Sequence, residues 1–308
     1  MKNMLKNKVV GIVAFAFLAL FSLQASYAGD IETVSFKSLD GKAMLVAYMF
    51  TPEGPGPYPA VVMMHGRSGV YSSLANGVYD EEKISARHKA WGRFWAERGY
   101  AALLVDSFGP RGYPEGFKKY SYEERPSELN EVTIRPLDAY AALNYLRSRP
   151  EIVPDRIGLQ GWSNGGSATL STIADSAPGI TDPDPLKGFR AAISFYPGCG
   201  LKGKYDDYYK PYAPVLLFAA SDDEEVSPNA CVNLAQRGKS SGGDIDIFVY
   251  KEAQHSFDNP SKKVQAVEAN RTATADAQRK AEDFFRTHLE AGLPKWTAAS
   301  VSHIDLLR

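Results

Sequence analysis

The amino-acid sequence predicts an α/β fold with a mostly parallel central sheet and helices on both of its faces. Continuous apolar runs such as "YPAVVMMHG" (58–66) are typical of strands that are buried on both faces. These runs alternate with segments of helical periodicity that are ten or more residues long. With 308 residues, of which 44% are hydrophobic and 12% aromatic, the chain can bury the core that such a fold needs.

The elements follow one another in a regular order. A hairpin comes first, because two β-rich runs flank Asp40-Gly41. Residues 86–98 then place Trp91, Phe94 and Trp95 on one side of a helix, which Gly99 ends. Further strands are expected at 58–66, 100–106, 155–161, 189–197, 213–221 and 244–250, and further helices at 131–150, 166–175, 228–238 and 272–291. Residues 107–130, with prolines, glycines and five aromatic residues, predict a long surface excursion.

The first 28 residues have the pattern of a secretory signal peptide. Three lysines precede an uncharged apolar run of about fifteen residues, and small residues follow, so that cleavage is expected after Ala28. A membrane anchor is the alternative, but the run is shorter than the roughly 20 residues that a spanning helix needs. We therefore expect a periplasmic or secreted protein without a stable membrane anchor.

Residues 29–308 are expected to form a single domain. Removal of the three leader lysines would change the formal net charge from −1 to −4. A mildly acidic chain without a basic run gives no indication of nucleic-acid binding.

The five histidines have no ligand-like spacing, so no metal site is expected. In an oxidising compartment the two cysteines, Cys199 and Cys231, first suggest a disulfide. The sequence does not predict an oligomeric state.

Ser163 is the candidate nucleophile. It stands in Gly161-Trp162-Ser163-Asn164-Gly165, between a predicted strand and a predicted helix. In a G-x-S-x-G elbow the turn is so tight that a side chain two positions from the serine would collide with the neighbouring strand or helix. The turn lifts the serine hydroxyl above the sheet at a helix N-terminus, where backbone N–H groups point toward developing negative charge.

A nucleophilic serine needs a histidine to take its proton and a carboxylate to hold that histidine. In this kind of sheet the expected chain order is serine, acid, histidine. His255 follows the last strand in the loop "KEAQHSFDNP" and is the candidate base. The acid is expected in the cluster after the strand at 213–221; Asp223 is favoured, because Asp223-x-x-Val226 resembles a run common in hydrolases, and Asp222 is the alternative.

Two backbone N–H groups are expected to form an oxyanion hole. One comes from Asn164, the residue after the nucleophile. The other is expected from Arg67 in "MMHGRSG" (63–69), the loop after an early strand. That loop could equally be a simple strand-to-helix turn in which His65 makes a structural hydrogen bond, and the two interpretations are compatible.

Taken together, these motifs resemble the dienelactone hydrolase family of the α/β-hydrolase superfamily. The resemblance covers most of residues 40–290 and rests on "HGRSGV", "DSFGPRG", "GWSNGG", "SFYPGCG", residues 223–231 and "QHSF". It implies the α/β-hydrolase fold and cleavage of carboxylic esters or lactones without a cofactor, so that the expected partner is a small-molecule ester or lactone. By motif it carries the catalytic roles to Ser163, His255 and Asp223, and the main-chain donor roles to Arg67 and Asn164.

One departure from the family pattern affects the expected substrate. The dienelactone hydrolases proper have cysteine at the nucleophile position, whereas this chain has Ser163. A general serine esterase is therefore expected rather than activity on dienelactone. The alternatives are a serine peptidase of the prolyl-oligopeptidase type and a non-catalytic binding protein with the same fold.

Within this fold the cysteines and the excursion acquire expected places. Cys199 follows one strand and Cys231 opens the helix after the next, so that we expect a disulfide that pins the acid-bearing loop. Arg111 and the aromatic residues of the excursion lie beside the site. They form either a packed surface loop or, in a second interpretation, a segment in which Arg111 organises the pocket through a carboxylate.

Overall fold

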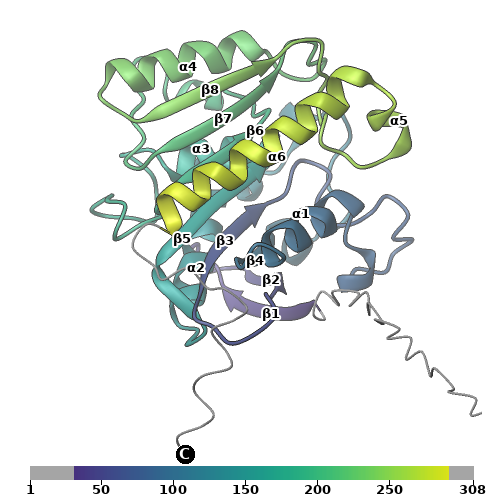
Figure 1. Cartoon of the computed structure of the whole chain (residues 1–308), viewed down its shortest axis with the longest axis vertical. Helices are drawn as coiled ribbons and strands as arrows, with labels where there is room; N and C mark the ends of the chain where they lie inside the picture. The colour runs from purple at the N-terminus through teal and green to yellow at the C-terminus, as the bar shows by residue number, and fades with distance from the viewer. Residues whose placement is uncertain (1–30, 291–308) are drawn as a thin grey trace, which may run out of the picture.

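The computed structural model describes residues 31–290 (Figure 1). The predicted signal peptide with its cleavage after Ala28, the residues beyond 290 and His303 lie outside this range. Eight strands form one sheet: β1 (Glu32–Lys37), β2 (Met44–Phe50), β3 (Tyr58–Met64), β4 (Ala101–Asp106), β5 (Ile152–Trp162), β6 (Ala192–Phe195), β7 (Val215–Ala220) and β8 (Ile245–Tyr250).

The sheet has the order β1-β2-β4-β3-β5-β6-β7-β8. The β1–β2 and β2–β4 pairs are antiparallel, and every pair from β4–β3 to β7–β8 is parallel. The predicted hairpin around Asp40-Gly41 is the β1–β2 pair, in which Lys37 lies opposite Met44. The prediction of a mostly parallel sheet is therefore confirmed.

Helices cover both faces of the sheet. Helices α1 (Ala86–Ala96) and α6 (Glu268–Leu289) lie on one face, and α2 (Arg135–Arg147), α3 (Asn164–Thr172) and α4 (Pro228–Ser240) pack on the other (Figure 1). Alternate residues of β3 enter the two cores: Ala60, Val62 and Met64 face the α2–α3 side, while Val61 and Met63 face α1 and α6. This alternation explains why the buried strand is apolar throughout.

The predicted helices differ from the observed ones at their ends, and the largest differences are at the starts of α2 and α6. The helix expected at 131–150 begins only at Arg135, because the Asn130 side chain accepts hydrogen bonds from the N–H groups of Val132 and Thr133 and closes a turn there. The last helix begins at Glu268 rather than near residue 272. The short helix α5 (Lys262–Gln265) was not predicted, because four residues carry no readable periodicity.

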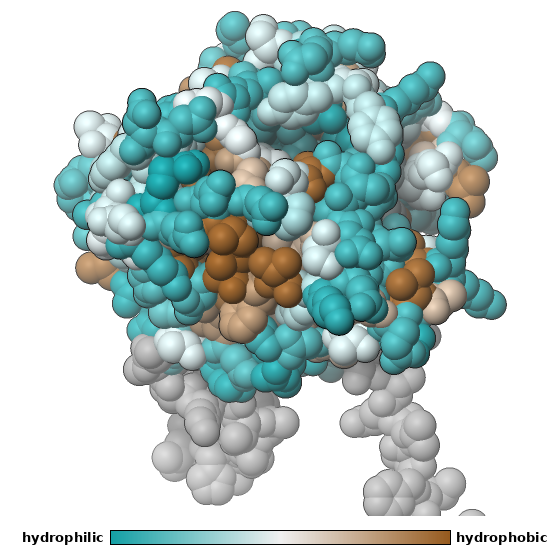
Figure 2. Space-filling view, turned by 90° about the horizontal axis from the view of Figure 1, so that it is seen from above, coloured by the Kyte–Doolittle hydropathy of each residue, from teal (hydrophilic) through white to brown (hydrophobic). Residues whose placement is uncertain are grey.

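The excursion at 107–130 contains only three short 3-10 helices, at Gly109–Arg111, Tyr122–Glu124 and Ser127–Leu129. Its irregular character agrees with the prediction. Seen from above, the surface is mostly hydrophilic, with its largest group of apolar side chains near the middle of the view and smaller groups elsewhere (Figure 2). Within residues 31–290, no helix combines the length and the apolar character needed to cross a bilayer.

Candidate active site

Ser163 lies in a strained turn between β5 and α3. Its backbone has φ 52° and ψ −117°, a conformation that costs a non-glycine residue about 1–3 kcal/mol. A Cβ atom at Gly161 would overlap the carbonyl oxygen of Gly165, and one at Gly165 would overlap that of Met64. The glycines of the motif are thus required by the close approach of α3 to β5 and β3, as the elbow interpretation expects.

The structure brings Ser163, His255 and Asp223 into one hydrogen-bonded chain. His255 Nδ1 lies 2.8 Å from Asp223 Oδ2, and His255 Nε2 lies 3.0 Å from Ser163 Oγ. With its proton on Nδ1, His255 donates to Asp223 and accepts from the serine hydroxyl through Nε2. The side chains of His255 and Asp223 are only 4% and 1% exposed, whereas Ser163 is partly exposed, so that the hydroxyl end of the chain is the end open to a ligand.

Asp223 and Asp222 have different environments. The second carboxylate oxygen of Asp223 accepts hydrogen bonds of 2.9 Å from the N–H groups of Glu225 and Val226. Asp222 is exposed and accepts from Ser221 Oγ at 2.8 Å. The carboxylate that holds His255 in this structure is therefore that of Asp223.

The loop after β3 lies directly against Ser163. A Cβ atom at Gly66 would stand 3.3 Å from the Trp162 carbonyl oxygen and 3.5 Å from Ser163 Cβ. Among residues 31–290, the backbone N–H groups of Arg67 and Asn164 have no hydrogen-bond acceptor. Neither N–H group is therefore engaged by another group of this part of the chain.

His65 fixes this loop to the neighbouring strand. Its Nδ1 donates to the Gly66 carbonyl at 2.7 Å, and its Nε2 accepts from the Ser107 N–H at 3.2 Å. Burial, followed by the charge of Arg135, holds the pKa of His65 well below its usual value, so the ring is neutral. The structural interpretation of His65 agrees with these contacts.

Arg135 was not recognised in the sequence, and it links the loop after β3 to the start of α3. Its fully buried guanidinium donates to Asn164 Oδ1 at 2.7 Å and to the His65 carbonyl at 2.8 Å. Burial lowers the pKa of Arg135 to about 10, which still leaves it charged at neutral pH. An arginine in the first turn of a helix looks like a solvated residue, so no sequence signal distinguished it.

Asp258 was also missed and links the histidine loop to the elbow. One of its oxygens accepts from the indole N–H groups of Trp91 at 2.8 Å and Trp162 at 2.9 Å. The other oxygen accepts from the Tyr196 hydroxyl, and the centroids of the Tyr196 and His255 rings are 4.8 Å apart. Asp258 is three residues from His255, and Trp162 precedes Ser163, so that this buried carboxylate holds the loop of His255 against the turn of Ser163.

Arg67 and Glu225 form an ion pair beside His255. Arg67 donates to both carboxylate oxygens of Glu225, at 2.9 and 3.0 Å, and to the Phe117 carbonyl at 2.9 Å. The Phe117 N–H donates back to the Arg67 carbonyl at 2.8 Å. The loop after β3, the loop after β7 and the excursion at 107–130 are therefore joined at one point.

His88 and His288 are not part of this chain of contacts, as expected. His88 is buried in α1, where its Nδ1 donates to the Val70 carbonyl at 3.0 Å. Burial, and then the charge of Arg87, lower the pKa of His88 to about 3. Its Nε2 is buried and has no hydrogen-bond partner among the described residues, which disfavours a charged ring.

We expect His88 to make the stability of the protein depend on pH. Because its folded pKa lies below the value of 6.5 for the unfolded chain, the unfolded state takes up the proton first, and stability is lost as the pH falls below about 6.5. The free energy of unfolding should fall by about 1 kcal/mol between pH 6.5 and 5.5 on account of His88. Urea unfolding at several pH values measures this dependence. In His88→Asn the free energy of unfolding should fall by about 1 kcal/mol less between pH 6.5 and 5.5 than in the wild type. The same fall in both proteins would contradict the role of His88.

Cys199 and Cys231 form a disulfide, with their Cα atoms 5.0 Å apart. Cys199 follows β6 and Cys231 lies in the first turns of α4. The disulfide therefore ties the helix that follows the acid loop to the neighbouring strand end, in the place expected from the resemblance.

Arg111 is buried among carboxylates. It donates to both oxygens of Asp138 in α2, at 2.9 and 2.8 Å, and to Asp40 in the β1–β2 turn at 2.5 Å. These contacts, rather than one with the triad, fix the start of the excursion to the body of the protein. The interpretation of a packed loop accounts for Arg111.

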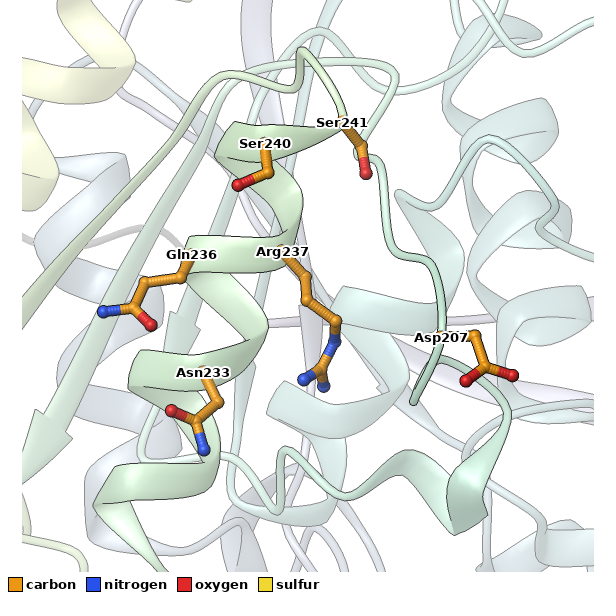
Figure 3. Close-up of a pocket in the computed structure, with 6 residues that line it drawn as sticks. All are labelled: Asp207, Asn233, Gln236, Arg237, Ser240 and Ser241. Atoms are coloured by element: carbon orange, nitrogen blue, oxygen red, sulfur yellow. The ribbon is translucent and has the colours of Figure 1, made fainter.

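A separate open hollow lies beside α4 (Figure 3). It is lined by Asp207, Asn233, Gln236, Arg237, Ser240 and Ser241. Arg237 points toward the segment that carries Asp207, and its Nε donates to the Tyr205 carbonyl at 3.1 Å. Ser163, Asp223 and His255 do not line this hollow.

Within residues 31–290, no group of three or more histidine, cysteine, aspartate or glutamate residues could hold a metal ion.

The sequence model of the dienelactone hydrolase family matches residues 45–289. The chain belongs to the dienelactone hydrolase family. A Bradyrhizobium sp. protein named "Probable 2-oxo-3-(5-oxofuran-2-ylidene)propanoate lactonase" is 22% identical over 240 residues, which are 73% of this chain and 85% of that protein. The quorum-quenching protein AidA of Acinetobacter baumannii (strain MDR-ZJ06) is 30% identical over 172 residues, 55% of this chain and 49% of AidA.

Among solved structures, the dienelactone hydrolase-like promiscuous phosphotriesterase P91 from metagenomic libraries has a similar fold. It aligns with a TM-score of 0.61 and 19% identity, over 85% of this chain and 99% of its own. These findings agree with the expected α/β-hydrolase fold, and membership of the dienelactone hydrolase family identifies the protein as a hydrolase that acts on esters.

Proposed function

We propose that this dienelactone hydrolase family member is an exported serine hydrolase that cleaves carboxylic esters or lactones through an acyl-enzyme on Ser163. The observation that carries the proposal is the continuous chain from Asp223 through His255 to Ser163, with distances of 2.8 and 3.0 Å. A serine hydroxyl in such a chain can lose its proton to the histidine as it attacks a carbonyl carbon.

The proposed cycle uses each group once in each half-reaction. Ser163 Oγ attacks the carbonyl carbon while His255 Nε2 takes its proton, and Asp223 stabilises the imidazolium. The oxyanion accepts hydrogen bonds from the unpartnered N–H groups of Arg67 and Asn164. The alcohol then leaves with the proton of His255, and water hydrolyses the acyl-enzyme by the reverse proton path.

The serine at the nucleophile position favours esters and lactones in general over dienelactone. The lactonase name of the Bradyrhizobium relative supports lactones as a substrate class to be tested. We further propose that residues 29–308 form one hydrolase domain behind a cleaved leader. An export route is consistent with the Cys199–Cys231 disulfide, because disulfides persist in oxidising compartments.

A substrate panel tests the proposed function. Purified protein should release p-nitrophenol from p-nitrophenyl esters of graded chain length and open simple lactones, while peptide anilides should remain intact. Faster turnover of peptide anilides would favour the peptidase alternative. Absence of any turnover together with reversible ester binding would favour a non-catalytic binding protein.

A further inference from the structure

A second carboxylate lies on the nucleophile side of His255. Glu225 Oε2 is 3.9 Å from His255 Nε2, the atom that lies 3.0 Å from Ser163 Oγ. The acid of the triad, Asp223, lies instead at Nδ1, on the opposite side of the ring. Glu225 therefore faces the space in which His255 exchanges protons with the reacting groups.

Glu225 is held in this place by cations. Arg67 donates to both of its oxygens, and Lys119 Nζ lies 3.6 Å from Oε1. Burial by itself would raise the pKa of Glu225, but the hydrogen bond from Arg67 and the positive charges of Arg67 and Lys119 hold the pKa below its usual value. The group is an oriented carboxylate anion at neutral pH, with a side chain that is 14% exposed.

The two half-reactions place different demands on this space. During acylation, the serine hydroxyl itself fills the hydrogen-bonding position at Nε2. In the acyl-enzyme Ser163 Oγ is esterified, and Nε2 must take a proton from water instead. One water molecule at ordinary hydrogen-bond distances of about 2.8 Å can contact both Nε2 and a carboxylate oxygen 3.9 Å from it.

We propose that Glu225 orients the hydrolytic water of the deacylation step, an inference that rests on the serine-hydrolase function proposed above. The water donates one hydrogen to His255 Nε2 and the other to Glu225 Oε2. Its oxygen attacks the acyl carbon as the first proton passes to Nε2. The bond from Ser163 Oγ to the acyl carbon then breaks, Oγ recovers the proton from Nε2, and the carboxylic acid leaves. Glu225 gains and loses no proton.

Pre-steady-state kinetics of Glu225→Gln with p-nitrophenyl acetate test this role. The amide replaces one acceptor oxygen by a donor, so that the water loses its second acceptor. We expect a burst of p-nitrophenol followed by a steady-state rate that is at least about tenfold lower than in the wild type, which is about 1.4 kcal/mol of barrier. The acylation rate should stay within about threefold.

Glu224→Gln is the matched control. Glu224 belongs to the same loop and pairs with Lys119 at 2.9 Å, and it accepts from the His255 N–H at 3.2 Å. The amide keeps an oxygen for that hydrogen bond, so both half-reactions should stay within about threefold of the wild type. A similar selective loss of deacylation in this variant would contradict the assignment to Glu225.

Two results for Glu225→Gln would overturn the inference. Equal slowing of acylation and deacylation would mean that the Arg67–Glu225 pair only holds the loop after β3 and the loop after β7 together. Unchanged deacylation would mean that the hydrolytic water does not need the Glu225 carboxylate. The rate of Ser163 labelling by a fluorophosphonate separates this inference from the proposed function. Normal labelling with unchanged hydrolysis contradicts the role of Glu225 alone, whereas a wild-type protein that is not labelled contradicts the nucleophile and Glu225 together.

Discussion

Ser163→Ala is expected to lower kcat for p-nitrophenyl esters by a factor on the order of 10⁴ or more. The loss follows because the acyl-enzyme cannot form without Oγ, while the oxyanion donors and the substrate contacts remain. The fold should be retained, because serine already bears the strain of a Cβ atom at φ 52° and alanine adds no larger group. Initial rates with purified protein, together with a thermal unfolding curve, measure both parts of the expectation.

Ser167→Ala is the matched control for this variant. Ser167 lies one turn further along α3, and its hydroxyl contacts two backbone carbonyl oxygens, that of Gly198 at 3.0 Å and that of Ser163 at 3.3 Å, and no side chain of Ser163, His255 or Asp223. Its removal should change ester turnover by less than about tenfold. Near wild-type activity in Ser163→Ala, or an equal loss in both variants, would contradict the assignment of Ser163 as the nucleophile.

Asp223→Asn is expected to lower kcat by a factor on the order of 10³ to 10⁴. The asparagine would present an amide where the carboxylate now accepts the Nδ1 proton of His255, which favours the wrong tautomer and removes the charge that stabilises the imidazolium. Asp222→Asn should change kcat by less than about threefold, because Asp222 is exposed and bonded to Ser221. Steady-state kinetics of the two variants side by side give the comparison.

The reverse pattern, with a large loss in Asp222→Asn and little change in Asp223→Asn, would reassign the acid. Equal and small effects would mean that His255 needs no carboxylate partner. The two positions are adjacent in sequence, so a difference between them reports on the orientation of single side chains rather than on damage to the loop.

Much of the fold could be predicted because its signals are local. The apolar run at 58–66 became β3 and the Asp40-Gly41 turn became the β1–β2 hairpin, each from a pattern within a few residues. The limits of α2 were less accurate, because the Asn130 turn competes with the first helical turn through hydrogen bonds that periodicity does not describe.

Two residues of the candidate site could be predicted because their motif and their order along the chain are typical of hydrolases with this fold. The elbow motif and the order serine, acid, histidine indicated Ser163 and His255. The choice of Asp223 over Asp222 depended on the resemblance of Asp223-x-x-Val226 to a run common in hydrolases. In a cluster of neighbouring carboxylates, the sequence does not show which side chain points toward His255.

The positions of Arg135, Asp258 and Glu225 in the site could not be predicted from the sequence. Each acts through contacts between segments far apart in the chain: Arg135 with Asn164, Asp258 with Trp91, and Glu225 with Arg67, 158 residues away. In the sequence they appear as ordinary charged residues of helices and loops. Only the folded arrangement distinguishes a buried, partnered charge from a solvated one.

The central claim is that Ser163 is an activated nucleophile, and covalent labelling tests it most directly. Wild-type protein treated with a fluorophosphonate should gain the mass of one adduct, peptide mapping should place it on Ser163, and Ser163→Ala should gain none. Absence of an adduct on the folded wild-type protein, or an adduct on another residue that persists in Ser163→Ala, would contradict the account.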